Sequence, residues 1–159
     1  LINRGDTAGR WRVLHPEPGD KFPQADDNTL VLLGDFHGTR VLLLSDLGRP
    51  GQEALLARQP DLRADIVVAG LPEQTEPLCD ALLEAIQPRL IIVADSEFPA
   101  TKRASPRLRD RLAQRRVPVL YTRFTGAVTL TIARKGWELR AMDGTHFAPD
   151  RRLPRSLFF

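Results

Sequence analysis

The chain alternates between short apolar runs and amphipathic segments along most of its length. Each apolar run is bounded by turn-forming residues such as Gly, Pro, Asp and Ser, which is typical of buried β-strands in an α/β protein. The apolar runs predict strands over residues 11–15, 30–33, 41–44, 64–70, 90–94 and 117–122, then an antiparallel pair over residues 126–134 and 137–142. The amphipathic segments predict helices over residues 50–59, 76–87 and 106–116. Strands that alternate with helices favour a layered α/β domain.

Capping residues mark the predicted helix starts. Thr75 is placed to cap the second helix, which has Pro77 in its first turn. Ser105 is placed to cap the third helix, with Pro106 at its first position. The hydroxyl of a capping residue accepts a hydrogen bond from a free N–H group in the first turn of a helix. Proline is favourable in that turn because it has no N–H group that would lack a partner. Pro118 indicates that the strand containing it lies at a sheet edge or begins there.

Residues 28–46 carry the most information about a possible site. The runs over residues 30–33 and 41–44 flank a polar turn and predict a β-hairpin. The second run leads directly into Asp46, which places a carboxylate at the carboxyl end of a buried strand. In α/β proteins, ligands and metals bind at such strand ends. Asp46 is therefore the first candidate for a functional residue.

The composition is that of an ordinary globular domain. With 159 residues, 42% hydrophobic and 27% charged, the chain is long enough for one domain with one core. It contains no apolar run of the ~18 residues that a membrane span needs. Cys79 is the only cysteine, which excludes an intrachain disulfide and a thiolate metal cluster. The chain starts at Leu1 rather than Met, so we expect a piece of a longer protein.

Positive charge is concentrated in two parts of the sequence, although the net charge is only +3. One group of arginines comprises Arg103, Arg107, Arg109, Arg111, Arg115, Arg116 and Arg123, and a second comprises Arg151, Arg152 and Arg155. Clustered cations attract phosphate groups, but arginines along a helix more often form a solvated face. The candidate nucleic-acid contacts are Arg103, Arg107, Arg111 and Arg115. A solvated helix surface is the alternative.

Several fragments, taken in order, resemble a known family. They are WRVLHP (residues 11–16), DNTLVL (27–32), RVLLLSDL (40–47), ADIVV (64–68), AIQPRL (85–90) and YTRFTGAV (121–128). These fragments are similar to motifs in the C-terminal half of a metallo-β-lactamase-fold domain. The resemblance is in particular to the domain at the end of ComEC-type competence proteins, which internalise DNA.

The resemblance implies an α/β, metallo-β-lactamase-like half-domain over residues 1–142, followed by an Arg/Pro-rich tail over residues 143–159. Such a half-domain is a mixed β-sheet flanked by helices and forms part of an αββα sandwich. In the complete sandwich, the other face of the sheet packs on a second sheet. Without the first half, that apolar face needs another cover. We therefore expect a homodimer, or a sheet capped by the chain's own tail.

The resemblance also implies a metal centre, but this chain has few of its ligands. Hydrolases of the family bind two divalent ions through an H-x-H-x-D-H loop in the first half and through later Asp and His residues. Asp46 stands at the place of the family's bridging Asp, whereas residues 69–74 and 102–106, at the places of two histidine motifs, contain no histidine. Glu73 is the alternative oxygen ligand in the first of these segments, but we favour a loop that has lost its ligands. Each ion needs several ligands, so we expect zinc or manganese only if a missing half supplies the others.

Three functions remain open. The first is a non-catalytic, degenerate domain of a ComEC-like DNA-uptake protein, in a scaffold or DNA-contacting role. It implies a soluble domain on the extracytoplasmic side of a bacterial membrane, with DNA and the rest of a membrane-embedded parent as partners. The second is a working metal-dependent, nuclease-like hydrolase whose other ligands lie in an absent N-terminal half. The third is a structural protein-interaction module that binds no nucleic acid.

Other residues with chemical potential are isolated in the sequence. His15, His37 and His146 show no metal-ligand spacing, and we interpret His15 as structural. Residues 101–105 precede a helix N-terminus, where they would either bind a phosphate or only cap the helix, and we favour the cap. The aromatic content of 6% disfavours a dedicated single-strand-binding surface, where bases stack on exposed rings.

Overall fold

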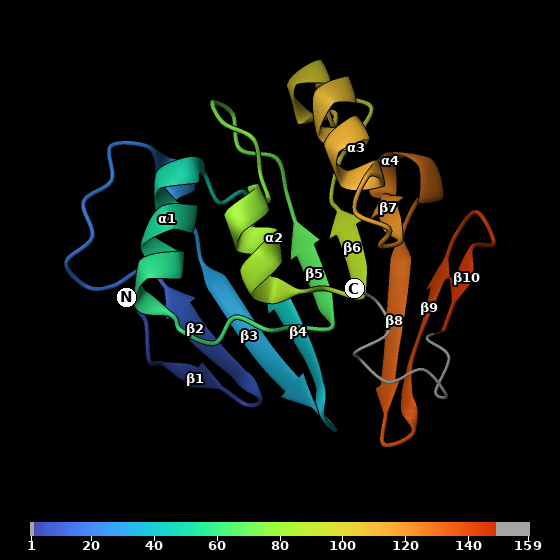
Figure 1. Ribbon diagram of the computed structural model, residues 1–159, viewed down its shortest axis with the longest axis horizontal. Coiled ribbons are helices and arrows are strands. Elements are labelled where there is room, and N and C mark those ends of the chain that lie inside the picture. Colours follow the sequence, from blue (N-terminus) through green and yellow to red (C-terminus); the bar gives the residue numbers. More distant parts are fainter. Residues whose placement is uncertain (1, 149–159) are drawn as a thin grey trace.

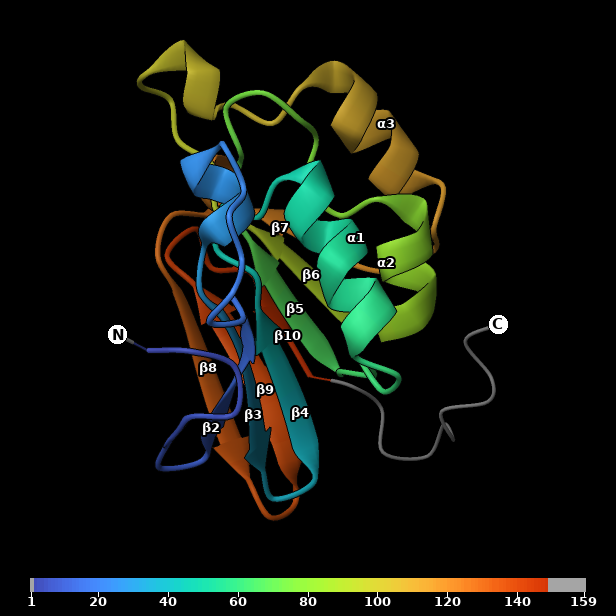
Figure 2. The same ribbon diagram turned by 90° about the vertical axis from the view of Figure 1, so that its left-hand side faces the viewer.

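A computed structural model of the protein describes residues 2–148 and has three layers (Figures 1 and 2). A seven-stranded sheet contains β1 (Thr7–Ala8), β2 (Trp11–His15), β3 (Val31–Phe36), β4 (Thr39–Leu43), β5 (Ile66–Ala69), β6 (Leu90–Val93) and β7 (Val119–Tyr121). A three-stranded sheet contains β8 (Val128–Ala133), β9 (Gly136–Ala141) and β10 (His146–Phe147). The helices are α1 (Arg49–Arg58), α2 (Asp80–Ile86), α3 (Pro106–Ala113) and α4 (Thr122–Thr125), with short 3-10 helices η1 (Ala25–Asn28) and η2 (Ala100–Lys102). None of the helices described is long and apolar enough to cross a membrane.

The large sheet is mixed, and its strands lie in the order of the sequence. Strands β1 to β4 pair antiparallel, as hairpins allow, whereas β4 to β7 pair parallel. Parallel neighbours need crossover connections, which here contain α1, α2 and α3. Figure 2 shows these helices on one face of the sheet. Because β4 to β7 run in the same direction, their carboxyl ends meet at one edge.

A core of branched aliphatic side chains fills the space between the helices and the large sheet. It joins Leu42 of β4 and Val67 of β5 to Leu55 of α1, Leu82 of α2 and Leu112 of α3, and all of these side chains are fully buried. Burying one such side chain stabilises the fold by about 1.5–3 kcal/mol. The apolar stripe of each crossover helix is therefore explained by this interface.

The opposite face of the large sheet packs on the small sheet. Val41, Ile66 and Ile92 form a second core together with Trp137 and Leu139 of β9. The half-buried side chains around this core include Trp11, Phe36, Leu43 and Val68. The small sheet thus covers part of this face, although the sequence led us to expect a second copy or the tail there, and within residues 2–148 the rest of the face is incompletely covered.

The segment predicted as a tail contributes to this second layer. Strand β10 pairs with β9, and the ring of Phe147 lies 5.6 Å from that of Trp137 between centroids. Residues 149–159, which include the second group of arginines, lie outside the described residues. The dimer predicted from the apolar sheet face stays a prediction.

The α/β class is confirmed, and each predicted strand has its counterpart. The capped start of α3 is also confirmed, because Ser105 Oγ accepts a 3.0 Å hydrogen bond from the N–H of Leu108. This favours the simple helix cap over the phosphate site. The short helix α4 and the strands β1 and β10 were not predicted from the sequence.

The predicted start of the second helix is wrong. Helix α2 begins at Asp80, because Leu78 takes a left-handed conformation with φ 56° that interrupts a helix. Thr75 Oγ1 accepts a 3.1 Å hydrogen bond from the N–H of Arg49, so its hydroxyl serves the start of α1 instead. The N–H of Cys79 donates to Gln52 Oε1 of α1 at 2.9 Å. Contacts with α1 therefore override the local capping signal.

Candidate functional site

The carboxyl ends of the parallel strands bring together four segments that are distant in sequence. Asp46 follows β4, Leu71 follows β5, Asp95 follows β6 and Thr122 follows β7. In Figure 1 this edge, called the carboxyl edge below, lies at the top of the parallel strands. Open α/β sheets bind ligands outside the carboxyl ends of their strands. The carboxyl edge is therefore the candidate functional site.

A lysine reaches Asp46 at this edge. Lys102 Nζ, at the end of η2, donates to Asp46 Oδ2 at 3.0 Å and to the carbonyl oxygen of Leu71 at 3.0 Å. The side chains of Lys102 and Asp46 are 32% and 40% exposed. One ammonium therefore fastens the η2 segment to the ends of both β4 and β5.

The surroundings of Lys102 are acidic. The hydrogen bond to Asp46 raises the pKa of Lys102 above its ordinary value of 10.5, against a partial desolvation that lowers it. The charges of Asp26 and Glu73 raise the pKa of Lys102 further. Lys102 is therefore a permanent cation at neutral pH.

The backbone around Asp46 leaves room for its carboxylate. Ser45 has a φ of 50°, and its carbonyl oxygen accepts a 2.8 Å hydrogen bond from the N–H of Gly70. A Cβ atom on residue 70 would lie 1.8 Å from Asp46 Oδ1. Only glycine permits this close approach of the β5 end to the Asp46 side chain.

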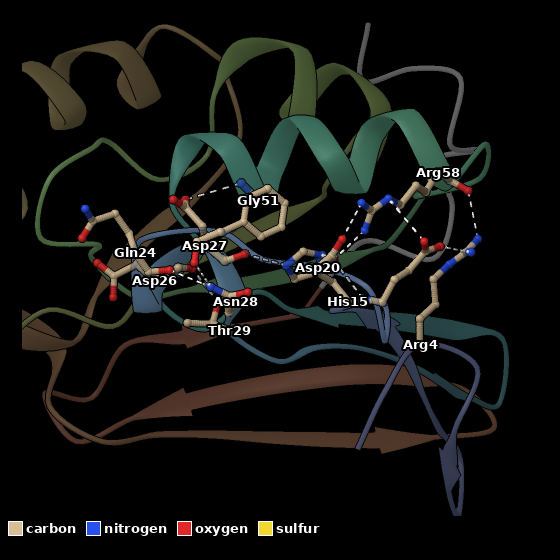
Figure 3. Close-up of polar contacts among 12 residues, drawn as sticks. Arg4, His15, Asp20, Gln24, Asp26, Asp27, Asn28, Thr29, Gly51 and Arg58 are labelled. Atoms are coloured by element: carbon tan, nitrogen blue, oxygen red, sulfur yellow. Dashed lines mark hydrogen bonds and ion pairs between the residues drawn. The ribbon is translucent and has the colours of Figure 1, made fainter. Parts of the chain in front are cut away.

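The turn before β3 is tied to the same edge. Asp26 Oδ2 accepts a 2.7 Å hydrogen bond from the N–H of Glu73, and Asp27 Oδ1 lies 3.4 Å from the N–H of Gly51 in the first turn of α1. Figure 3 shows the contact between Asp27 and Gly51. These carboxylates bind backbone N–H groups and so have structural partners. The side chain of Glu73 itself is exposed.

A divalent metal does not fit the residues at Asp46. Within residues 2–148, no group of three or more His, Cys, Asp or Glu side chains could hold a metal ion. The ammonium of Lys102 already lies at hydrogen-bond distance from Asp46, and a second cation beside it would be repelled. The role of Asp46 as a metal ligand stays a prediction that depends on residues outside this chain.

Asp95 is a second carboxylate at the edge, and the sequence analysis missed it. Its side chain is buried; Oδ1 accepts from the N–H of Arg123 at 2.9 Å and Oδ2 from the N–H of Ala104 at 3.3 Å. The Thr122 hydroxyl donates to the Asp95 carbonyl oxygen at 2.6 Å. Asp95 thus holds the start of α4 and the loop before α3 together. Its position directly after a buried strand is the same signal that singled out Asp46.

Two exposed phenyl rings lie in the segments that follow β6 and β7, each with an arginine beside it. The guanidinium of Arg103 lies 5.7 Å from the ring centroid of Phe98, and that of Arg123 lies 4.4 Å from that of Phe124. Phe98 is 81% exposed and Phe124 is 57% exposed. Glu97 pairs with Arg103 at 2.7 Å and with Arg123 at 3.5 Å. Both arginine charges are therefore balanced locally.

The arginines predicted to contact DNA lie on α3 and just before and after it, in different environments. Arg111 donates to the carbonyl oxygen of Leu78 at 2.7 Å and pairs with Asp80 at 3.1 Å. Arg115 pairs with the same Asp80 carboxylate at 2.6 Å. Hydrogen bonds from Arg115 and Arg111 lower the pKa of Asp80. These two arginines fasten α3 to the start of α2.

Arg107 is the predicted contact that is most accessible. Its side chain is 87% exposed, and its Nε lies 3.9 Å from the nearest Glu76 carboxylate oxygen. Arg103 is already paired with Glu97. DNA contact by these arginines stays a prediction, and Arg107 is the residue best placed for it.

His15 is structural, as predicted. It is fully buried; Nε2 lies 2.7 Å from the Asp27 carbonyl oxygen and Nδ1 lies 3.7 Å from Asp20 Oδ2. Asp20 in turn accepts two 2.6 Å hydrogen bonds from Arg58 of α1 (Figure 3). Exposed His37 lies in the β3–β4 turn, and exposed His146 in β10. The histidines therefore belong to three different parts of the fold.

A scan against models of known protein families finds no match, and no curated protein matches the sequence. These comparisons assign no family to the chain. Its function is therefore inferred from the carboxyl edge, where the positions of Asp46, Lys102 and Asp95 are the principal observations.

Proposed function

We propose that this chain is a non-catalytic, metallo-β-lactamase-like half-domain of a ComEC-like DNA-uptake protein. The single observation that carries the proposal is the 3.0 Å contact between Lys102 Nζ and Asp46 Oδ2. Lys102 belongs to the segment that corresponds to a histidine motif of the resembled family. That segment thus sends an ammonium, and not an imidazole, to the carboxylate that would bridge two ions.

The ammonium can replace one property of a metal ion but not the others. It balances the charge of Asp46 and holds the carbonyl of Leu71, so the loops of the edge stay in place. It offers no open coordination position and does not lower the pKa of a bound water as a metal does. Lys102 therefore supports a structural role for the edge.

The arrangement of layers also supports a half-domain. Helices cover one face of the large sheet, and a small sheet covers part of the other face (Figure 2). This is the arrangement that part of an αββα sandwich would have. Under the proposal, the domain is extracytoplasmic, the rest of a membrane-embedded parent completes it, and DNA is a further partner.

Metal content tests the non-catalytic role. The purified chain is incubated with zinc or manganese, desalted exhaustively and examined by elemental analysis, together with Asp46→Ala and the control Glu53→Ala on the exposed side of α1. We expect no stoichiometric metal in any of them. One equivalent of metal that is lost only in Asp46→Ala would contradict the proposal and favour the working hydrolase.

DNA binding tests the contacting role separately. Fluorescence anisotropy with a labelled duplex at increasing salt should show that Arg107→Ala weakens binding and reduces the slope of log K against log salt by about one. Arg134→Ala, in the exposed β8–β9 turn, is the matched control. If the chain does not bind DNA even at low salt, the structural interaction module becomes the better function.

A further inference from the structure

The edge strands of the two sheets differ in length. The large sheet ends in β1, with two residues, and in β7, with three. The small sheet ends in β10, with two residues, and in β8, with six. Short edge strands are one way in which proteins prevent unwanted strand pairing. Strand β8 lacks this protection.

The sequence of β8 also lacks the other protective features. It reads Val-Thr-Leu-Thr-Ile-Ala, without charge, proline or glycine. Its paired neighbour β9, by contrast, carries Glu138 and Arg140. Proteins blunt exposed edges with charges, prolines or bulges, and an uncharged edge of β-branched residues readily pairs with another strand.

The hydrogen-bonding groups of β8 alternate between β9 and the open side. The N–H of Met142 donates to the Ala127 carbonyl oxygen at 3.1 Å, so residue 127 bonds toward β9. In an antiparallel ladder, every second residue then directs its N–H and C=O away from that neighbour. On β8 these residues are Val128, Leu130 and Ile132, and within residues 2–148 no strand pairs with this side of β8.

The side chains of the same residues are incompletely covered. Val128, Leu130 and Ile132 belong to the core between the sheets but are only half-buried, whereas Trp137 and Leu139 of β9 are buried. In Figure 1, β8 is the strand of the small sheet that lies toward the large sheet, with β9 and β10 farther out. A strand added to β8 would extend the small sheet across the face that it leaves uncovered.

Exposed apolar side chains lie near the start of β8. Met142 is 80% exposed and Phe124 is 57% exposed. Met142 lies beside Gly126, just before β8, where an added Cβ would be 3.0 Å from the Met142 Cβ. Methionine and aromatic residues are enriched in protein interfaces. Exposed apolar side chains therefore lie at the start of β8, with Met142 on its β9 side.

We infer that β8 receives an additional β-strand from another polypeptide, with an uncharged centre and apolar residues at alternate positions. Main-chain hydrogen bonds to Val128, Leu130 and Ile132 provide affinity, and the apolar side chains of the added strand cover the half-buried face of the large sheet. This inference goes beyond the proposed function and does not depend on it.

A synthetic strand peptide tests the inference. The probe is Lys-Thr-Val-Thr-Leu-Thr-Val-Thr-Lys, and its control has proline in place of the central leucine. We expect the probe, but not its control, to slow amide hydrogen exchange at Val128, Leu130 and Ile132 and to change the fluorescence of half-buried Trp11. Unchanged exchange at saturating probe would overturn the inference.

Two variants at one position separate the hydrogen bond from the side chain. Leu130→Ala retains the outward N–H and should bind the probe, whereas Leu130→Pro lacks it and should lose at least tenfold in affinity. Equal binding by both variants would contradict the edge pairing; if Leu130→Pro does not fold, the exchange measurement on the unaltered chain decides. Dimers of the chain in sedimentation equilibrium that Leu130→Pro abolishes would overturn the assignment to another polypeptide.

Discussion

Asp20 and Asp46 are each paired with one cation, but the two pairs differ in burial and geometry. Asp20 accepts two 2.6 Å hydrogen bonds from Arg58, and its side chain is 7% exposed. Asp46 accepts one 3.0 Å hydrogen bond from Lys102, and its side chain is 40% exposed. A guanidinium binds a carboxylate in a planar, bidentate way, whereas an ammonium is a point charge on a flexible stem.

We interpret the buried Asp20–Arg58 pair as one that stabilises the fold and the half-exposed Asp46–Lys102 pair as part of the candidate site. Arg58 at the end of α1 binds Asp20, and Asp20 lies 3.7 Å from His15 of β2. The pair therefore connects α1 to the large sheet. Lys102 neutralises a carboxylate at an edge where α/β proteins bind ligands. Asp46 receives one hydrogen bond from its cation, whereas Asp20 receives two from the fork of a single guanidinium. The two pairs should therefore respond differently to mutation and to pH.

Removing Arg58 should have the largest effect. Arg58→Met leaves the Asp20 carboxylate nearly buried without its partner, and we expect the free energy of unfolding to fall by about 2–3 kcal/mol. Urea denaturation measures this loss. Arg4→Met, which removes a more exposed ion pair with Glu17 and a hydrogen bond to the backbone carbonyl oxygen of Arg58, is the control and should change stability by less than about 1 kcal/mol. If both variants lose a similar free energy of unfolding, the buried pair is no more stabilising than an exposed one.

Acid should weaken the Asp20 pair next. The hydrogen bond from Arg58 lowers the pKa of Asp20 below its ordinary value of 3.8. A carboxyl with a lowered folded pKa stabilises the fold above its unfolded pKa, and this contribution disappears as the pH falls through the folded value. Unfolding free energies measured from about pH 5 downward should thus decline less steeply in Asp20→Asn than in the unaltered chain. Parallel curves would show that Asp20 is not the titrating group.

Much of the fold was predictable because its signals are local. The runs of buried strands, the hairpin ahead of Asp46 and the Ser105 cap depend on residues that are near in sequence. The start of α2 was not predictable in this way. The Thr75 hydroxyl had two helices within reach, and only tertiary contact selected α1.

The site was predictable in position but not in its partners. The carboxyl end of a buried strand identified Asp46, and the same rule applied to the run before Asp95 would have identified that residue too. Lys102 is 56 residues from Asp46, and no pattern in either segment names the other. The sequence contains only an indirect signal for Lys102. A cationic residue stands there in the segment where the resembled family has a metal ligand.

Removing Lys102 should have a smaller effect than removing Arg58. Lys102→Met loses one partly exposed ion pair and the hydrogen bond to Leu71, and we expect a loss of about 0.5–1 kcal/mol in urea denaturation. Lys135→Met, in the exposed β8–β9 turn, is the control and should change stability little. A loss as large as that of Arg58→Met would mean that Lys102 is a structural residue of the same kind.

The loss of the Lys102 charge at alkaline pH should have the smallest effect on the free energy of unfolding. The pKa of Lys102 is raised by Asp46, so its contribution is complete below the unfolded value near 10.5 and disappears as the pH rises through the folded value. Burial also raises the pKa of Tyr121, whose ionisation favours unfolding in the same range. Comparison of Lys102→Met and Tyr121→Phe with the unaltered chain above about pH 10 separates the two groups. If only Tyr121→Phe flattens the decline, the ammonium adds no stability at the carboxyl edge, and Lys102 neutralises Asp46 without holding the loops.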